Sequence, residues 1–152
     1  MLIARTVGFK QLDSWLGKAD KALNHTVHLY RTMGNIVLQD SFEAFATQSW
    51  HGEQWAPLAP ATVAQRDRAG NILHPTGAHI MNTLSIVDLR DDYVKVGTPN
   101  PWAHVHNAGA TLVGTAYGTI TLPKRTFIGL DEVLWEKLEK ALGFWLDVEV
   151  LG

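Results

Sequence analysis

Hydrophobic residues recur at three- and four-residue steps toward both ends of the chain, which is the spacing of an amphipathic helix. This spacing predicts an N-terminal helical extension over 1–22, a long helix over 23–48 and a C-terminal helix that begins at Asp131. The long helix has the clearest pattern, because its apolar positions fall on one face over its whole length. Gly17 weakens the extension by about 1 kcal/mol relative to alanine, so a break is expected there.

In the middle of the chain the hydrophobic period changes from helical spacing to alternation. Residues 84–89 and 93–97 alternate on either side of a turn, which predicts a β-hairpin. Further strands are predicted over 119–122 and 126–128, and the preceding segments are expected to form short helices and proline-rich loop. The expected short helices and the loop cover 62–68, 76–84 and 50–60.

This order of elements predicts one α+β domain over 1–152. The long N-terminal helix and the C-terminal helix are expected to pack on a small antiparallel β-sheet, from which a hairpin or loop protrudes. A parallel sheet of the dinucleotide-binding type is not expected, because strands and helices do not alternate along the chain.

The stretch from Val96 to Pro123 contains no Asp, Glu, Lys or Arg. It is too apolar for a solvated linker and too rich in glycine for a core strand. Part of it, 108–122, is therefore predicted to be a flexible arm that becomes ordered against another surface. The alternative is a hairpin folded back onto its own domain.

Composition excludes several classes of function. The chain has 152 residues, 46% of them hydrophobic, and this composition is typical of a folded domain rather than a disordered chain. Its formal net charge is −2, so the basic excess of a nucleic-acid-binding protein is missing. It has no cysteine, which excludes disulfides, thiolate metal sites and cysteine nucleophiles. No apolar segment is long enough to span a bilayer, and no membrane partner is expected.

Catalytic motifs are also missing from the sequence. No serine has the glycine neighbours of a hydrolase nucleophile, and no lysine follows the glycine-rich stretch in the manner of a phosphate-binding loop. We therefore predict no enzymatic activity, no cofactor and no metal. The alternative is a small metal-dependent hydrolase that uses His104 and His106, whose rings would share one face of a strand. Packing or hydrogen bonding by neutral imidazoles is the simpler interpretation.

Six tryptophans are unusual in a chain of this size. Trp50, Trp55 and Trp102 lie in segments rich in proline and glycine. Aromatic side chains on loops are enriched at protein interfaces, because they bury a large area at low entropic cost. Each of them could instead pin its loop to the core, and for Trp55 this interpretation is favoured.

An ordered set of short motifs resembles the phage virion morphogenesis proteins, the tail completion proteins of Mu-like and P2-like phages. The first motifs are similar to the family succession W-x-P-L…T…I-L…T-G and are Trp55-Ala56-Pro57-Leu58, Thr62, Ile72-Leu73 and Thr76-Gly77. Shorter matches follow at Leu84-Ser85-Ile86 and Val94-Lys95-Val96-Gly97-Thr98. The last two resemble Y-A-x-I-H-x-x-G and I-P-x-R-x-F-L-G and are Trp102-Ala103-His104-Val105-His106-Asn107-Ala108-Gly109 and Leu122-Pro123-Lys124-Arg125-Thr126-Phe127-Ile128-Gly129.

The resemblance covers roughly 23–146 and departs from the family at Trp102, where tyrosine is usual, and in the uncharged segment 110–121. It implies a non-enzymatic virion component that acts in tail completion or in formation of the head–tail neck. The implied location is the tail or neck of the virion, and the bacterial host cytoplasm during assembly, with the gene carried by a phage or a prophage. The implied partners are further copies of the chain in a ring such as a hexamer, and tail tube, terminator or head–tail connector proteins.

A ring subunit joins one surface patch to a different patch on its neighbour. The arm is the candidate for one side of this contact, and the long helix and Arg125 are candidates for the other. The guanidinium of Arg125 either clamps a carboxylate within the domain or reaches a neighbouring copy. The candidate interaction residues are Trp50, Trp102, His106, Gly109, Leu112, Val113, Tyr117 and Arg125.

Overall fold

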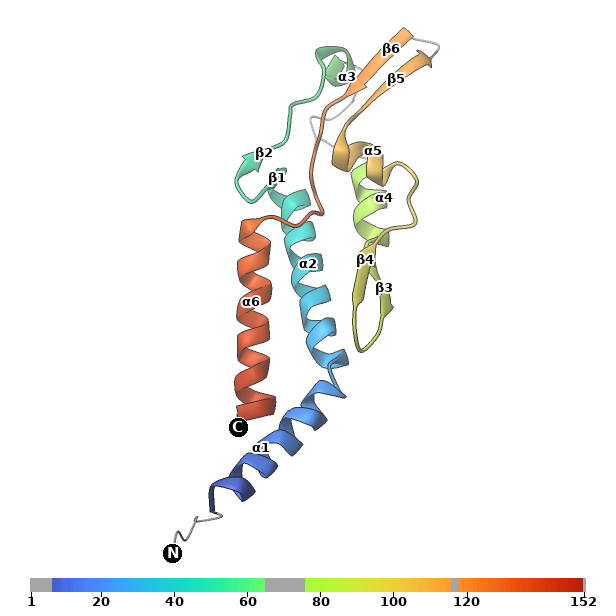
Figure 1. The fold of residues 1–152 in the computed structure, drawn as a ribbon. Helices are drawn as coiled ribbons and strands as arrows, with labels where there is room; N and C mark the ends of the chain where they lie inside the picture. The colour runs from blue at the N-terminus through green and yellow to red at the C-terminus, as the bar shows by residue number, and fades with distance from the viewer. Residues whose placement is uncertain (1–6, 65–75, 116–117, 152) are drawn as a thin grey trace, which may run out of the picture.

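The computed structural model describes residues 7–64, 76–115 and 118–151. Two helices form its body: α2 (Val27–Thr47) and α6 (Glu132–Leu146) lie side by side, and α6 runs into the short π-helix η1 (Asp147–Leu151). The N-terminal helix α1 (Val7–Leu23) crosses below them and packs on η1 (Figure 1). No helix in the described ranges is both long and apolar enough to cross a membrane.

The long helix is shorter at its start than predicted. Residues 24–26 form a turn between α1 and α2, so the helix begins at Val27 and not at residue 23. Asn24 ends α1 by donating its side-chain amide to Asp20 O at 2.9 Å. Thr26 donates its hydroxyl to the carbonyl oxygen of Asp91, which ties this turn to the turn between strands β3 (Ser85–Leu89) and β4 (Val94–Gly97). Gly17 lies inside α1, so the break predicted at that glycine is wrong.

The α+β class is confirmed, with strands that form three separate two-stranded antiparallel sheets in the described residues. The predicted hairpin over 84–89 and 93–97 is confirmed as β3–β4, which has a bulge between Ile86 and Asp88. The predicted strand over 126–128 is wrong, because these residues form a loop. The remaining elements are β1 (Ser49–Trp50), β2 (Glu53–Gln54), α3 (Pro60–Ala64), α4 (Thr76–Thr83), β3 (Ser85–Leu89), β4 (Val94–Gly97), α5 (Ala103–Ala108), β5 (Ala110–Thr115) and β6 (Gly118–Leu122).

The core lies at the C-terminal end of α2, where side chains from distant segments meet. The ring of Phe45 lies 5.6 Å from that of Trp55 in an edge-on contact and 5.0 Å from that of Phe127. Ile80 and Leu134 add α4 and α6 to the same buried cluster. The two long helices and the central loops are therefore held together near the middle of the molecule, where α2 ends and α6 begins.

The β3–β4 hairpin packs on the side of α2 at Gly34. A β-carbon at this position would lie 2.8 Å from Val94 Cγ2 and 2.9 Å from Ile86 Cδ1. The absence of a side chain therefore lets the helix and the hairpin approach closely.

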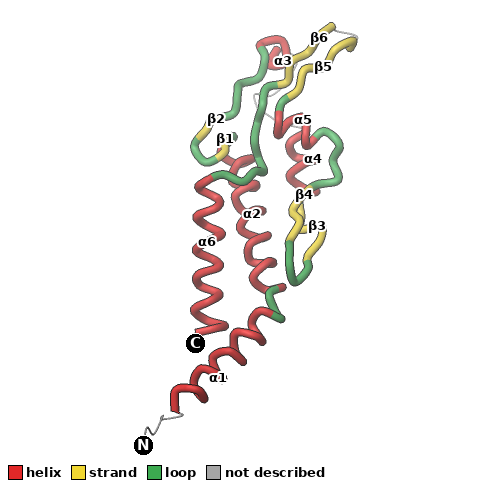
Figure 2. The backbone as a smooth tube through the Cα atoms, viewed as in Figure 1, coloured by secondary structure: helices red, strands yellow, loops and turns green. Residues whose placement is uncertain are grey.

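The β5–β6 hairpin projects from the opposite end of the molecule to α1 (Figure 2). It forms most of the predicted arm over 108–122, and the prediction of a protruding hairpin is confirmed. Val113 is 79% exposed on it. Tyr117, a predicted contact residue, falls outside the described residues.

Candidate interaction site

The segment between β6 and α6, residues 123–129, crosses the centre of the fold and is bound from two directions. Arg125 N donates to His106 O at 2.9 Å, which attaches the segment to α5. Trp55 Nε1 donates to Thr126 O at 2.7 Å, which attaches it to the loop after β2. Phe127 is 1% exposed, so its ring anchors the segment in the core.

Asn107 on α5 completes the attachment of this segment. Its Oδ1 accepts hydrogen bonds from Phe127 N at 2.9 Å and Ile128 N at 3.1 Å. Its Nδ2 donates to Ile128 O at 2.9 Å. One side-chain amide therefore satisfies backbone groups that a neighbouring strand would otherwise pair, which explains why residues 126–128 are not a strand. Asn107 lies within one of the motifs that resemble the family, but its sequence context predicted no role for it.

Arg125 is directed into its own domain. It is 4% exposed, and it donates from Nε to Ala56 O at 3.1 Å and from a terminal nitrogen to Pro57 O at 3.2 Å. These contacts place the guanidinium within its own domain, as one of the two hypotheses expected, with the carbonyl oxygens of Ala56 and Pro57 as partners. A contact between Arg125 and a neighbouring copy stays a prediction.

Gly109 also has a structural role within the domain. Its φ is +76°, a conformation that side chains disfavour, and a β-carbon would lie 2.9 Å from Lys124 N. Glycine therefore permits the end of α5 to approach the start of the 123–129 segment. The motif residues Trp55, Asn107, Gly109 and Arg125 thus meet around one crossing of the chain, although they are far apart in the sequence.

The loop tryptophans have different environments. Trp50 is 6% exposed and belongs to the core, so its ring is covered by its own domain. Its role as a contact residue stays a prediction. Trp55 pins its loop to the core, as the analysis favoured. Trp102, just before α5, is 54% exposed and offers an aromatic surface to solvent.

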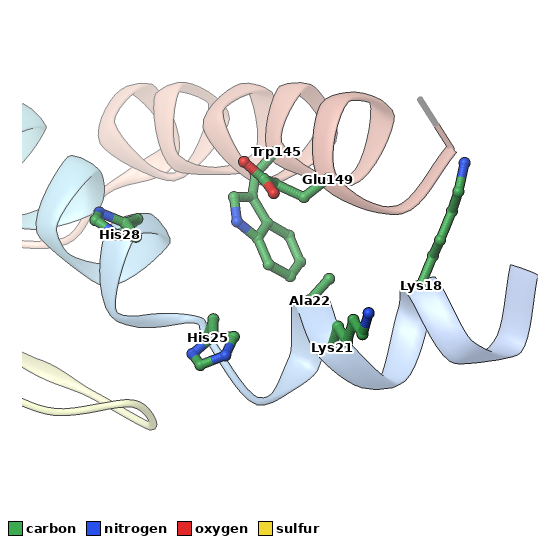
Figure 3. Close-up of a pocket in the computed structure, with 7 residues that line it drawn as sticks. All are labelled: Lys18, Lys21, Ala22, His25, His28, Trp145 and Glu149. Atoms are coloured by element: carbon green, nitrogen blue, oxygen red, sulfur yellow. The ribbon is translucent and has the colours of Figure 1, made fainter.

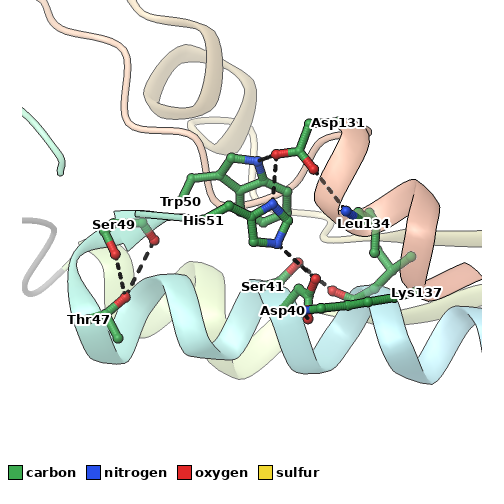
Figure 4. Close-up of polar contacts among 10 residues, drawn as sticks. Asp40, Ser41, Thr47, Ser49, Trp50, His51, Asp131, Leu134 and Lys137 are labelled. Atoms are coloured by element: carbon green, nitrogen blue, oxygen red, sulfur yellow. Dashed lines mark hydrogen bonds and ion pairs between the residues drawn. The ribbon is translucent and has the colours of Figure 1, made fainter. Parts of the chain in front are cut away.

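A polar cluster joins α2 to the start of α6 (Figure 4). His51 lies between two carboxylates, with Nε2 2.8 Å from Asp40 Oδ2 and Nδ1 2.6 Å from Asp131 Oδ2. Asp131 also caps α6 by accepting from Leu134 N at 2.9 Å, and it accepts from Trp50 Nε1 at 2.7 Å. We call Asp40, His51 and Asp131 the carboxylate–histidine cluster.

Lys137 extends this cluster by donating from Nζ to Asp40 Oδ1 at 2.7 Å. The side chain of Asp40 is 3% exposed, so this buried carboxylate is bound from two sides, by the ammonium of Lys137 and the imidazole of His51. Burial tends to raise the pKa of Asp131, but hydrogen bonds from Leu134 N, His51 and Trp50 outweigh it and hold that pKa below 3.8. The sequence analysis missed the cluster, because its members are separated in the chain and match no motif.

His104 and His106 do not form the pair that the hydrolase alternative requires. Both lie on α5, a helix, where residues two apart point about 200° around the axis. In the described residues, no group of three or more His, Asp or Glu side chains is arranged to hold a metal ion. The strand on which this alternative depended is therefore not present.

His106 faces inward instead. Its Nδ1 is buried and has no hydrogen-bond partner among the described residues. Burial lowers the pKa of His106 below 6.5, and the positive charge of Arg125 lowers it further. His106 thus supports the junction between α5 and the 123–129 segment, and its ring is half-buried there.

An open pocket of about 260 Å³ lies where α1, the start of α2 and the end of α6 meet (Figure 3). The indole of Trp145 projects from α6 toward Ala22 on α1. Basic side chains outnumber the one carboxylate in the lining, which gives the pocket positive character in a chain of net charge −2. The polar lining residues are Lys18, Lys21, His25, His28 and Glu149.

Two further surfaces carry exposed apolar side chains. On the β5–β6 hairpin, Leu112 is half-buried opposite Ile120, and Val113 is exposed. The second group is on α6, where Trp135 and Leu142 were expected to face the core. Two sides of the helix carry exposed apolar residues, Trp135, Leu142 and Leu146 on one and Val133 and Phe144 on the opposite one. The long helix α2 was also predicted to offer a contact surface. Phe42 is a large apolar side chain that is exposed on it.

The comparison with known families agrees with the motifs that converge on the 123–129 segment. The model of the phage virion morphogenesis family matches residues 7–147, from α1 through α6. No curated protein and no solved structure matches the chain. Since the family match covers nearly the whole chain, this protein belongs to the phage virion morphogenesis family.

Proposed function

We propose that this protein is a non-enzymatic assembly component that completes the phage tail or forms the head–tail neck. In this proposal it acts by joining copies of itself in a ring and by docking onto tail tube, terminator or connector subunits. The family supports a virion assembly role, and the projecting β5–β6 hairpin is the observation that carries the more specific function.

The hairpin has the properties of a contact element. It extends beyond the body of the molecule, and the chain around it carries no formal charge from Val96 to Pro123. Its exposed Val113, together with Trp102 near its base, places apolar surface in water. Such surface is stabilised when another protein covers it.

The exposed apolar positions of α6 supply a candidate for the second contact surface. Trp135, Leu142 and Leu146 are 52%, 38% and 39% exposed and lie along one side of the helix, because steps of seven and eleven residues return to nearly the same angle. A ring requires two different patches per copy, and the hairpin and α6 lie in different parts of the molecule. The tail or connector partner would then bind a surface that the ring leaves open.

The non-enzymatic assignment is supported by how the motif residues are used. Asn107, Arg125 and Trp55 all direct their polar atoms to backbone groups of their own chain. Their hydrogen bonds hold loops together, so they are unsuited to act on a substrate. Gly109 permits close backbone approach and supplies no reactive group.

The experiment uses a phage or prophage that encodes this chain, with the gene disrupted. Separate heads and tails should accumulate, and joined particles should be absent in electron micrographs. Addition of the purified protein to the lysate should restore joined, infectious particles. A matched control is the same protein without residues 110–122, which should fold, as judged by circular dichroism, and should fail to restore joining.

Two results would contradict the proposal. Normal numbers of joined particles without the gene would show that the protein is not needed for completion. Restoration of joining by the protein that lacks residues 110–122 would show that the hairpin is not the contact element.

A further inference from the structure

We infer that the copies in the ring are joined through their backbones, with the β5 edge of one hairpin paired to the β6 edge of the next. This inference rests on the self-association in the proposed function and specifies its contact. In the described residues, β5 and β6 pair only with each other. Each therefore has an outer edge whose backbone N–H and C=O groups face away from the hairpin.

The hairpin lacks the charged and proline side chains by which proteins often protect strand edges. Its ladder has a register shift between Leu112 and Thr115, so the edge pairing that we infer uses the regular part of the ladder, 110–112 and 120–122. Charged side chains, especially lysine, and proline normally discourage edge-to-edge pairing. Neither β5 nor β6 contains a charged residue or a proline. An isolated two-stranded hairpin is also only marginally stable in water, so additional strands would stabilise it.

The β3–β4 hairpin provides an internal comparison. It is also two-stranded, but Asp88 and Lys95 lie on its strands and Arg90 directly follows β3. It also packs on α2 through Ile86 and Val94. The β3–β4 hairpin, which carries charged residues, is thus covered by its own domain. The β5–β6 hairpin, which carries none, projects from the domain.

A second copy of this chain is the partner that uses both edges. A strand from another protein would pair with one edge and leave the other open. If β5 of each copy pairs with β6 of its neighbour, every edge is paired when the ring closes. Because β5 and β6 are antiparallel and ring copies are related by rotation, the new pairs are antiparallel as well.

The side chains of the hairpin are compatible with this arrangement. Thr111 lies opposite Thr121 on one exposed face, and Leu112 lies opposite Ile120 on the other, half-buried face. Repetition around a ring would place threonine beside threonine and aliphatic beside aliphatic side chains. Both kinds of cross-strand pair are favourable, and no like charges would meet.

Cysteine cross-linking tests the pairing directly, because the natural chain has no cysteine. One preparation carries Thr111→Cys on β5, and a second carries Thr121→Cys or Thr119→Cys on β6. When the two are mixed and oxidised, we expect disulfide-linked dimers that contain one copy of each variant. Thr119 is included because a strand slipped by two residues keeps the same face.

The outcomes separate the inference from the proposed function. The oxidation is carried out on the purified protein and on particles assembled with it. Assembly without mixed dimers would overturn the edge pairing and leave the ring proposal in place. Dimers of Thr111→Cys alone would indicate a two-fold contact between β5 edges, which also overturns the inference. If the protein formed no ring either on its own or in assembled particles, both the ring proposal and the edge pairing would be overturned.

A charge substitution gives a second test with a matched control. Val113→Lys places a positive charge on the hairpin at a side chain that is 79% exposed, so the fold should be unaffected. Val87→Lys makes the same change at a 57% exposed position on β3. We expect Val113→Lys to weaken assembly by about tenfold or more, since a lysine on an edge strand discourages pairing with another strand. Equal assembly of the two variants would contradict the inference.

Discussion

His51 Nδ1 lies 2.6 Å from Asp131 Oδ2, so the turn after β1 is bound to the residue that caps α6. The other ring nitrogen reaches Asp40 on α2 at 2.8 Å. One histidine therefore fixes where the C-terminal helix begins relative to the long helix. This contact sets the position of α6 and, with it, of the exposed apolar surface that we propose for assembly.

Replacement of Asp131 by alanine should destabilise the fold. The substitution removes the cap from Leu134 N and leaves Trp50 Nε1 without its carboxylate partner. We expect a loss of about 2–4 kcal/mol in the free energy of unfolding, measured with denaturant. Glu132→Ala is the control, because this neighbouring side chain is exposed, and it should change stability by less than about 0.5 kcal/mol. Equal losses in the two variants would contradict the role of the cap.

The same carboxylate should make stability depend on pH in the acid range. The pKa of Asp131 is held below 3.8 in the folded protein, so the unfolded chain binds a proton first as the pH falls. Its contribution is therefore present above the unfolded pKa and is lost as the pH falls through the folded pKa. Asp131→Asn removes this titration, so the fall in stability between about pH 5 and pH 3 should be smaller in the variant. An unchanged pH profile in denaturant titrations would be the opposing result.

Gly34 and Gly143 should respond in opposite directions to the same substitution. Gly34→Ala places a β-carbon 2.8 Å from Val94 Cγ2, and the resulting overpacking should cost about 1–3 kcal/mol. Gly143→Ala on α6 meets nothing within 4 Å and should stabilise the helix by about 0.5–1 kcal/mol. Thermal unfolding of both variants checks the pair. Stabilisation by Gly34→Ala would show that α2 and the β3–β4 hairpin are not in close contact.

Asn107 should be sensitive to chemically small changes. Asn107→Ala removes the acceptor for Phe127 N and Ile128 N and the donor to Ile128 O, so we expect a loss of about 2–4 kcal/mol. Asn107→Asp keeps the acceptor but places a carboxylate oxygen against Ile128 O, so it should also be destabilised at neutral pH. Protonation of this carboxyl group restores a donor, so its deficit should shrink as the pH falls, whereas that of Asn107→Ala should not. Denaturant unfolding of both variants at neutral and acid pH measures the difference, and deficits that change equally with pH would contradict the role of the donor bond.

His106 should titrate at a lower pH than an exposed histidine, since burial and then the charge of Arg125 lower its pKa. NMR titration of the Arg125→Met variant should show a pKa for His106 that rises but remains below 6.5, because burial persists. Arg90→Met, which removes a distant and exposed guanidinium, should leave that pKa unchanged.

The depressed pKa of His106 also has a consequence for stability. Its contribution is present above the unfolded value of 6.5 and is lost as the pH falls through the folded pKa. A pKa for His106 that did not respond to loss of Arg125 would contradict their electrostatic interaction.

The sequence alone determined the elements that local patterns specify. Period and turn chemistry located α2, α6 and the β3–β4 hairpin, because each has a repeating apolar face or an alternating one. The lack of charge from Val96 to Pro123 marked the segment that projects as β5–β6. The motifs also indicated the family, because their order along the chain can be recognised without knowing how they are arranged in space.

Only the tertiary structure decided what individual polar and aromatic residues do. Trp50 and Arg125 were expected at a contact surface, yet both are buried, because burial depends on which distant segments cover a loop. Residues 126–128 were predicted to form a strand, but the side chain of Asn107 binds their backbone and they are a loop. Hydrogen bonds between positions far apart in the chain leave no periodic signal, and the carboxylate–histidine cluster was missed for the same reason.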